Sequence, residues 1–188
     1  MDHRAAEDAL FGDALACEVS LPASLIPLPA RPEAVAQLCE AAETLLTGLA
    51  HVEDSHPDEK DQHGPLEVAL QRVEAKLDLV MGLLGSILAR EESAPSHHLR
   101  WSRLGVSVVM PDAVAPGDLR LLRLRPAHWL PQHLELPVRV LATVPEGNGQ
   151  RLWLAIEPAG GPLEAALERH LFRLHRREIA ARQHGRPT

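Results

Sequence analysis

A strict seven-residue repeat of apolar residues constrains this chain of 188 residues more than any other feature. In the stretch PLEVALQRVEAKLDLVMGLLGSIL, residues 65–88, apolar residues recur at alternating steps of four and three. They are Leu66, Leu70, Val73, Leu77, Val80, Leu84 and Ile87. This period predicts a helix, from about residue 65 to residue 92, that presents one apolar stripe to partner helices and supercoils with them.

A second stripe with the same period lies upstream, in residues 32–52. Its members are Val35, Leu38, Ala42, Leu45, Leu49 and Val52. Pro32 and Glu33 are typical of the first turn of a helix, so we predict that this helix begins at residue 32. The polar segment 53–63 separates it from the longer helix. The sequence therefore predicts two heptad-repeat helices.

The residue types in the longer stripe bear on the number of helices that associate. Leu70, Leu77 and Leu84 take the a positions, and β-branched residues fill most d positions, a combination that favours trimers or tetramers over two-stranded coils. A plain hairpin of the two helices and packing of the stripe against the rest of the chain are the alternatives. We predict a homo-tetramer that uses the seven apolar residues of the longer stripe together with Val35, Leu38, Leu45 and Leu49 of the upstream stripe.

The hydrophobic period changes from seven to two in the second half of the chain. Residues 99–111, 117–126, 134–144 and 151–158 predict strands, and the turn sequence EGNGQ joins the last two as a hairpin. A helix is predicted at about residues 163–182, with Leu163, Leu167, Leu171 and Leu174 on its apolar face.

These elements define the expected organisation. Residues 17–29 contain several prolines and predict an edge strand, because proline lacks the N–H that a central strand donates. We predict an α+β fold: a small antiparallel six-stranded barrel with a C-terminal helix, plus the two heptad helices. The expected parts are residues 1–31, a lead and edge strand, residues 32–95, the helical pair, and residues 96–188, the barrel and last helix.

Charge is spread unevenly along the chain, whose net charge is −7. Residues 1–96 hold 18 acids and 6 bases, and residues 97–188 hold 8 acids and 13 bases, all arginine. The overall acidity argues against a nucleic-acid partner. Three arginines at four-residue spacing form a stripe on the last predicted helix, which we expect to be a solvated face, with a partner surface as the alternative. They are Arg169, Arg173 and Arg177.

Several classes of function lack their sequence signatures. No apolar run is long enough to span a membrane, and the start of the chain does not look like a signal peptide, so we expect a cytoplasmic protein without a membrane partner. The two cysteines, Cys17 and Cys39, are expected to be reduced thiols. His51, His56 and His63 lie in an acidic segment without metal-ligand spacing, so we expect no metal or cofactor. No nucleophile or phosphate-loop motif is present, so we expect no enzyme.

Residues 100–111, RWSRLGVSVVMP, resemble the second motif of the PilZ family, [D/N]-x-S-x-x-G, at the start of a strand. Ser102 and Gly105 match its Ser and Gly, and the following strands and helix come in the order of that family. The resemblance implies a small barrel that binds the bacterial second messenger cyclic di-GMP, with Arg100, Ser102 and Gly105 at the binding positions. Arginine is suited to such a ligand because it grips phosphates and guanine edges with paired hydrogen bonds.

Two departures from the family pattern change this expectation. Arg100 stands where the family has Asp or Asn, and no R-x-x-x-R precedes the barrel. The resemblance therefore implies an atypical PilZ protein of cyclic di-GMP signalling, with weak or absent direct nucleotide binding, which acts through protein contacts. The alternative from another class is a structural adaptor that has no nucleotide ligand.

Overall fold

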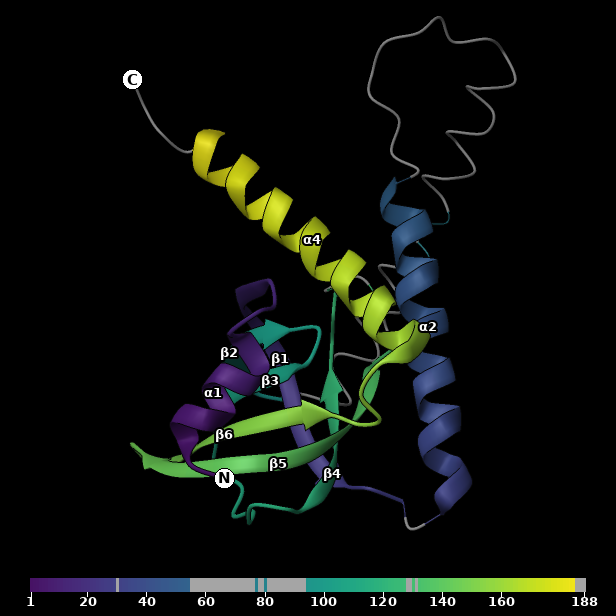
Figure 1. Cartoon of the computed structure of the whole chain (residues 1–188). Coiled ribbons are helices and arrows are strands. Elements are labelled where there is room, and N and C mark those ends of the chain that lie inside the picture. Colours follow the sequence, from purple (N-terminus) through teal and green to yellow (C-terminus); the bar gives the residue numbers. More distant parts are fainter. Residues whose placement is uncertain are drawn as a thin grey trace, which may run out of the picture.

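The computed structural model of the chain describes residues 1–29, 31–54, 77, 80, 94–127, 130 and 132–184. Six antiparallel strands close into a barrel in the order β1-β2-β3-β6-β5-β4 (Figure 1). The strands are β1 (Ala16–Pro27), β2 (Ser96–Ser102), β3 (Gly105–Met110), β4 (Leu119–Leu124), β5 (Leu134–Glu146) and β6 (Gly149–Ile156). The predicted six-stranded antiparallel barrel is confirmed, and so is the hairpin turn between its last two strands.

The strand predicted in residues 17–29 is present as β1, and it closes the barrel by pairing with a different strand along each half. Its first half, residues 16–22, pairs with β2, and its second half, residues 23–27, pairs with β4. Pro22 stands at the change of partner, where it pairs with Ser96, the first residue of β2. Its missing N–H is tolerated there because neither half of the strand is paired on both sides.

The region expected to be one strand at residues 99–111 is a hairpin of β2 and β3. A turn at Arg103 and Leu104 separates the two strands, and Leu99 of β2 pairs with Val108 of β3. The alternating pattern continues across this turn, so the period alone did not reveal the break.

Three helices in the described part of the chain pack on this barrel: α1 (His3–Phe11), α2 (Pro32–Asp54) and α4 (Gly161–His184). The α1 and α2 helices lie on opposite sides of the barrel, and α4 crosses from α2 over it (Figure 1). The helices predicted at residues 32–52 and 163–182 are thus present. The barrel core is aliphatic around Trp101, and Ala42 and Leu46 of α2 and Leu167 of α4 join it.

Part of the upstream stripe packs within the protomer. Ala42 joins the barrel core, and Leu49 is buried, with 3% of its surface exposed. Val35, Leu38 and Leu45 are half-buried. In the longer stripe, Leu77 and Val80 are helical and exposed, and the other predicted members lie outside the described residues: Leu66, Leu70, Val73, Leu84 and Ile87.

An ion pair joins the end of α2 to the middle of α4. The carboxylate of Glu53 lies 2.9 Å from Nη1 of Arg177 and 3.4 Å from Nε of Arg173, and only 8% of the Glu53 side chain is exposed. The expectation that this arginine stripe is a solvated face was therefore wrong for Arg173, which is 17% exposed, while Arg177 is paired with Glu53 but remains 54% exposed. The carboxylate that neutralises them comes from another helix, which the spacing within α4 does not reveal.

A buried histidine lies where α4 meets the barrel. His170 is 1% exposed, its ring centroid lies 5.6 Å from that of Trp101, and neither of its nitrogens has a hydrogen-bond partner among the described residues. Burial lowers the pKa of His170 to about 4, and the charges of Arg173 and Arg177 contribute to this shift. The folded protein therefore holds this imidazole neutral.

We predict that His170 makes the fold less stable as the pH falls from about 6.5 to about 4. In this window the unfolded chain binds a proton that the folded chain does not, so the free energy of unfolding falls with pH, by roughly 3 kcal/mol in total. His170→Phe keeps a ring beside Trp101 but cannot take up a proton. Urea unfolding at pH 7 and pH 4.5 should show a smaller loss of stability for this variant than for the wild type.

The matched control is His98→Gln, since His98 lies on β2 with 65% of its side chain exposed. This variant should lose as much stability as the wild type between the two pH values. An equal loss in the wild type and in His170→Phe would contradict the prediction.

Candidate functional site

The three predicted site residues lie together at the β2–β3 hairpin, and α1 covers them. Arg100 and Ser102 are in β2, and Gly105 is the first residue of β3. The structure therefore brings together the positions that the motif predicts. Each of them also contacts α1, a helix that lies in the segment predicted only as a lead.

Ser102 is fully buried and links the hairpin turn to α1. Its hydroxyl donates a hydrogen bond to the carbonyl oxygen of Leu10, at 2.6 Å. The same oxygen accepts hydrogen bonds from the backbone N–H groups of Leu104, at 3.1 Å, and Gly105, at 3.3 Å. The side chain therefore holds the turn in place and fixes the C-terminal end of α1 against it.

Position 105 requires glycine because neighbouring atoms approach its backbone too closely to leave room for a side chain. A Cβ atom at this position would lie 2.2 Å from the carbonyl oxygen of Leu154 and 2.8 Å from Cδ2 of Leu10. The first contact is with backbone of the paired strand β6, which cannot move aside easily. The glycine thus admits both β6 and α1.

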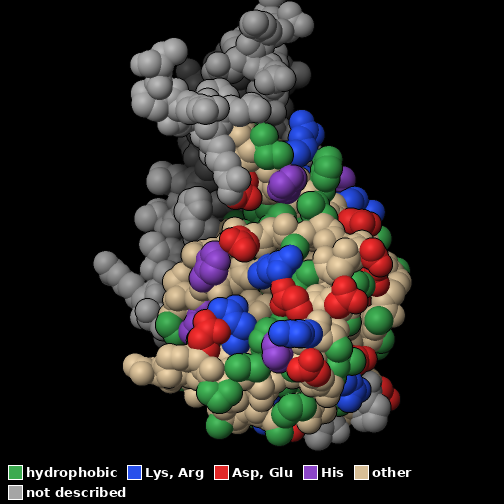
Figure 2. Space-filling model, turned by 60° about the vertical axis from the view of Figure 1, so that its left-hand side comes forward, with side chains coloured by type: hydrophobic (Ala, Val, Ile, Leu, Met, Phe, Trp, Pro, Cys, Tyr) green, Lys and Arg blue, Asp and Glu red, His purple; other side chains and the backbone are tan. Residues whose placement is uncertain are grey.

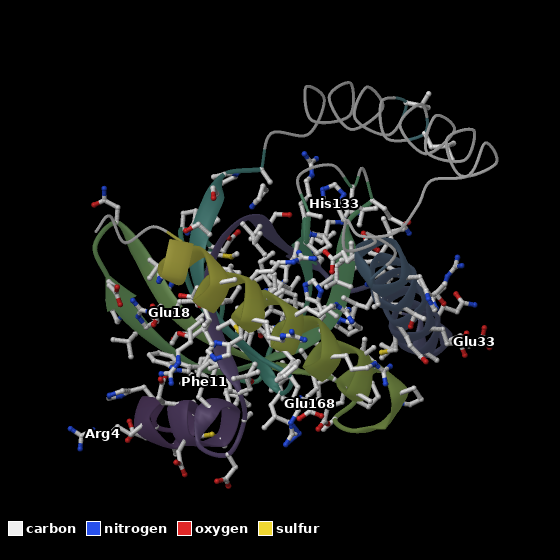
Figure 3. The ribbon with its side chains drawn as sticks, turned by 90° about the horizontal axis from the view of Figure 1, so that it is seen from above. Arg4, Phe11, Glu18, Glu33, His133 and Glu168 are labelled. Carbon is white, nitrogen blue, oxygen red and sulfur yellow. The ribbon has the colours of Figure 1, made fainter. Side chains whose placement is uncertain are left out.

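Arg100 is held by α1 through charge and through an aromatic ring. Its Nη1 atom donates a hydrogen bond to Oε1 of Glu7, and its guanidinium carbon lies 4.5 Å from the centre of the Phe11 ring. In Figure 3 Phe11 lies between α1 and the barrel, while Arg4 of the same helix points away from it. The arginine that replaces the Asp or Asn of the motif therefore has a carboxylate partner within the chain.

Glu7 and Trp153 are the residues of this site that sequence reasoning missed. The second carboxylate oxygen of Glu7 accepts a hydrogen bond from Nε1 of Trp153, at 2.6 Å. These two residues are 146 positions apart. An i, i+4 apolar pair, Ala6 and Leu10, was the available signal for an amphipathic helix at the N-terminus, but it does not say which surface that helix covers.

The surroundings of the site are mixed in charge. An open groove of about 450 Å³ runs beside α1, lined by histidine, arginine and acidic side chains together with Phe11 and Trp153. Acidic, basic and histidine side chains are interspersed on the face of the molecule turned forward in Figure 2. This pattern differs from the continuous basic surface that is typical of nucleic-acid binding.

In the described part of the chain, no three His, Cys, Asp or Glu side chains are grouped so as to hold a metal ion. Cys17 and Cys39 are free, and each contacts a backbone carbonyl, that of Leu171 at 3.3 Å and that of Glu157 at 3.7 Å. Burial raises the pKa of both thiols, so neither is an activated nucleophile. None of the described helices has the length and apolar character needed to cross a membrane.

We predict that Ser102→Ala destabilises the protein by about 1–3 kcal/mol, because the carbonyl of Leu10 and the two turn amides lose a buried partner. Ser96→Ala, at the exposed start of the same strand, should change the free energy of unfolding by less than about 0.5 kcal/mol. Urea denaturation of both variants at one protein concentration measures the difference. Equal stability of the two variants would contradict a structural role for Ser102.

Comparison with known proteins identifies the family. The family model of the atypical PilZ domain, cyclic di-GMP receptor, matches residues 46–184, well over half of the chain. No curated protein matches the sequence. Among solved structures, one from Xanthomonas campestris is 39% identical, with a TM-score of 0.79 over 94% of this chain and 97% of that chain. It is described as a tetrameric PilZ domain self-assembled via an unusual helical bundle. The resemblance seen in the sequence is thereby confirmed, and the chain belongs to the atypical PilZ domain family.

Proposed function

We propose that this protein is a non-enzymatic regulator of cyclic di-GMP signalling that acts through protein contacts and binds the nucleotide weakly or not at all at the family motif. The observation that carries the proposal is the position of α1 on the motif. Ser102 and Gly105 contact Leu10, and Arg100 is paired with Glu7. A ligand that used these residues would first have to separate them from α1.

Two further features of the motif support weak or absent binding. The family position for Asp or Asn holds Arg100, and the upstream R-x-x-x-R is missing from the sequence. Ser102 is fully buried, and its single hydroxyl proton is donated in the hydrogen bond to the carbonyl oxygen of Leu10. Each of the three residues therefore has a role within the fold that needs no nucleotide.

Calorimetric titration with cyclic di-GMP tests this part of the proposal. We expect no saturable binding in the micromolar range for the wild type, and the same result for Arg100→Ala. Arg139→Ala is the matched control, because Arg139 is also a strand residue paired with a single glutamate, Glu157. Saturable micromolar binding to the wild type that is lost in Arg100→Ala and kept in Arg139→Ala would contradict the proposal.

We also propose that the protein is a homo-tetramer assembled through its heptad helices. Three observations support this: the seven-residue repeat, the exposure of Leu77 and Val80, and the helical-bundle assembly described for the Xanthomonas protein. A groove of about 640 Å³ between α2 and Leu130 and Gln132 adds to them. Its small and apolar lining residues suit the close approach of another helix: Ala41, Leu45, Gly48, Leu49, Val52 and Leu130.

Sedimentation equilibrium tests the assembly. Leu77→Asp places a charge in the proposed helix interface, so we expect its mass to fall below that of the wild-type tetramer. Leu119→Asp is the control, since Leu119 is a comparably exposed leucine on β4 of the barrel, and this variant should remain a tetramer. A wild-type protein that sediments as a monomer, or equal effects of both substitutions, would contradict the proposal.

The second candidate function is a structural adaptor outside cyclic di-GMP signalling. The observation that favours it is the same engagement of Arg100, Ser102 and Gly105 in contacts within the chain, which gives the motif a purely structural role. Cellular cyclic di-GMP levels separate the two functions. A signalling protein should change its set of co-purifying proteins when the nucleotide is depleted, and an adaptor should keep the same set.

A further inference from the structure

The contact between α1 and the barrel has the composition of a helix–receptor interface. Ala6, Leu10 and Phe11 of α1 are buried against Ala142 and Trp153, in a hydrophobic cluster separate from the barrel core. This cluster lies on the outer side of the barrel, over β5 and β6. The apolar part of the contact is therefore confined to one small surface that a single short helix covers.

Three polar groups of the barrel recognise α1 at defined positions. Nη1 of Arg100 and Nε1 of Trp153 both donate hydrogen bonds to the carboxylate of Glu7, one to each oxygen. The hydroxyl of Ser102 donates to the last turn of the helix, at the carbonyl of Leu10. These donors select a helix that carries one carboxylate, with apolar residues one position before it and three and four positions after it.

The helix itself is held mainly by this surface. It has nine residues, and its N-cap, Asp2, makes no side-chain capping hydrogen bond. Helices shorter than about 12 residues are marginal in water, so α1 depends on its contacts with the barrel. A helix with its own small hydrophobic cluster, separate from the barrel core, is the kind of unit that can open at a lower free energy than the global fold. Residues 12–15 join it to β1 and keep it nearby when it is released.

We propose that the barrel face beneath α1 is a docking surface for an acidic amphipathic helix of a partner protein, with α1 as the occupant in cis. The surface consists of Arg100, Ser102, Ala142 and Trp153. The partner helix presents a Glu to Arg100 and Trp153 and places apolar residues where Ala6, Leu10 and Phe11 lie. Because α1 is tethered, it competes at a high effective concentration, and the partner helix binds when α1 is displaced.

This proposal depends on neither nucleotide binding nor self-association. The recognising groups are hydrogen-bond donors and apolar surface on a single protomer, and the ligand is a helix that carries a negative charge. Its failure therefore leaves the proposed tetramer and the proposed weakness of nucleotide binding untouched.

A peptide that copies α1 tests the surface directly. The probe is a fluorescently labelled synthetic peptide of residues 1–14, titrated with full-length protein and followed by anisotropy. In Leu10→Asp the helix α1 should leave the surface, because its buried leucine becomes a charge. We expect this variant to bind the peptide at least about tenfold more tightly than the wild type does, since the competitor in cis is gone.

Two controls show whether the peptide uses the proposed contacts. A peptide with Glu7→Gln should bind the Leu10→Asp protein more weakly than the unmodified peptide, because Arg100 and Trp153 lose the carboxylate. The double variant Leu10→Asp/Arg100→Ala should also bind more weakly. Equal binding to wild type and Leu10→Asp, equal binding of both peptides, or no binding to Leu10→Asp that has kept its fold would overturn the proposal.

Native-state hydrogen exchange on the wild type provides a test that does not need the Leu10→Asp variant to fold. If α1 detaches separately, its amides should exchange at least about tenfold faster than those of β5 and β6 at the same pH and temperature. Exchange of α1 at the rate of β5 and β6 would mean that the helix leaves only when the barrel unfolds. That result would overturn the proposal whatever the outcome with the peptide.

Discussion

The pairing of β1 with both β2 and β4 is the interaction on which the other elements depend. It closes the barrel with a strand that lies far from the other five in the sequence, and it fixes where the chain enters and leaves that strand. The segment before it, α1, is brought to the β2–β3 hairpin because Ala16 pairs with Ser102. The segment after it, α2, begins beyond the far end of β1 and packs on β5 and α4. The covered motif and the inner face of α2 both follow from this closure.

The motif of this atypical PilZ domain has a structural explanation at each of its positions. Ser102 holds a tight turn, Gly105 admits a neighbouring backbone, and Arg100 neutralises Glu7. The first two roles belong to the β2–β3 hairpin of the barrel, while the contacts to α1 are additions that use the same atoms. A motif match therefore locates the hairpin without establishing that its surface is open to a ligand.

The sequence predicted those parts of the fold that depend on local periodicity. The strict alternation of residues 134–144 located β5, and the seven-residue spacing with Pro32 located the start of α2. The break between β2 and β3 was missed, because its turn carries neither glycine nor proline. The pairing of β1 with β4, which closes the barrel, and the contact of Glu7 with Trp153 both join residues that are far apart in the chain. No local sequence pattern indicates such pairs. The motif positions of the candidate site were predicted, but the packing of α1 over them was not.

The two faces of α2 connect the barrel to the proposed assembly. Ala42 and Leu46 join the barrel core, and the groove that Ala41 and Gly48 line lies between α2 and Leu130 and Gln132. Near the end of the helix, Glu53 binds Arg173 and Arg177 of α4, so this end of α2 is held against a second helix that also packs on the barrel. Because α2 packs on β5 and α4, a change in how the barrel holds α2 would move the surface that α2 offers to the proposed assembly.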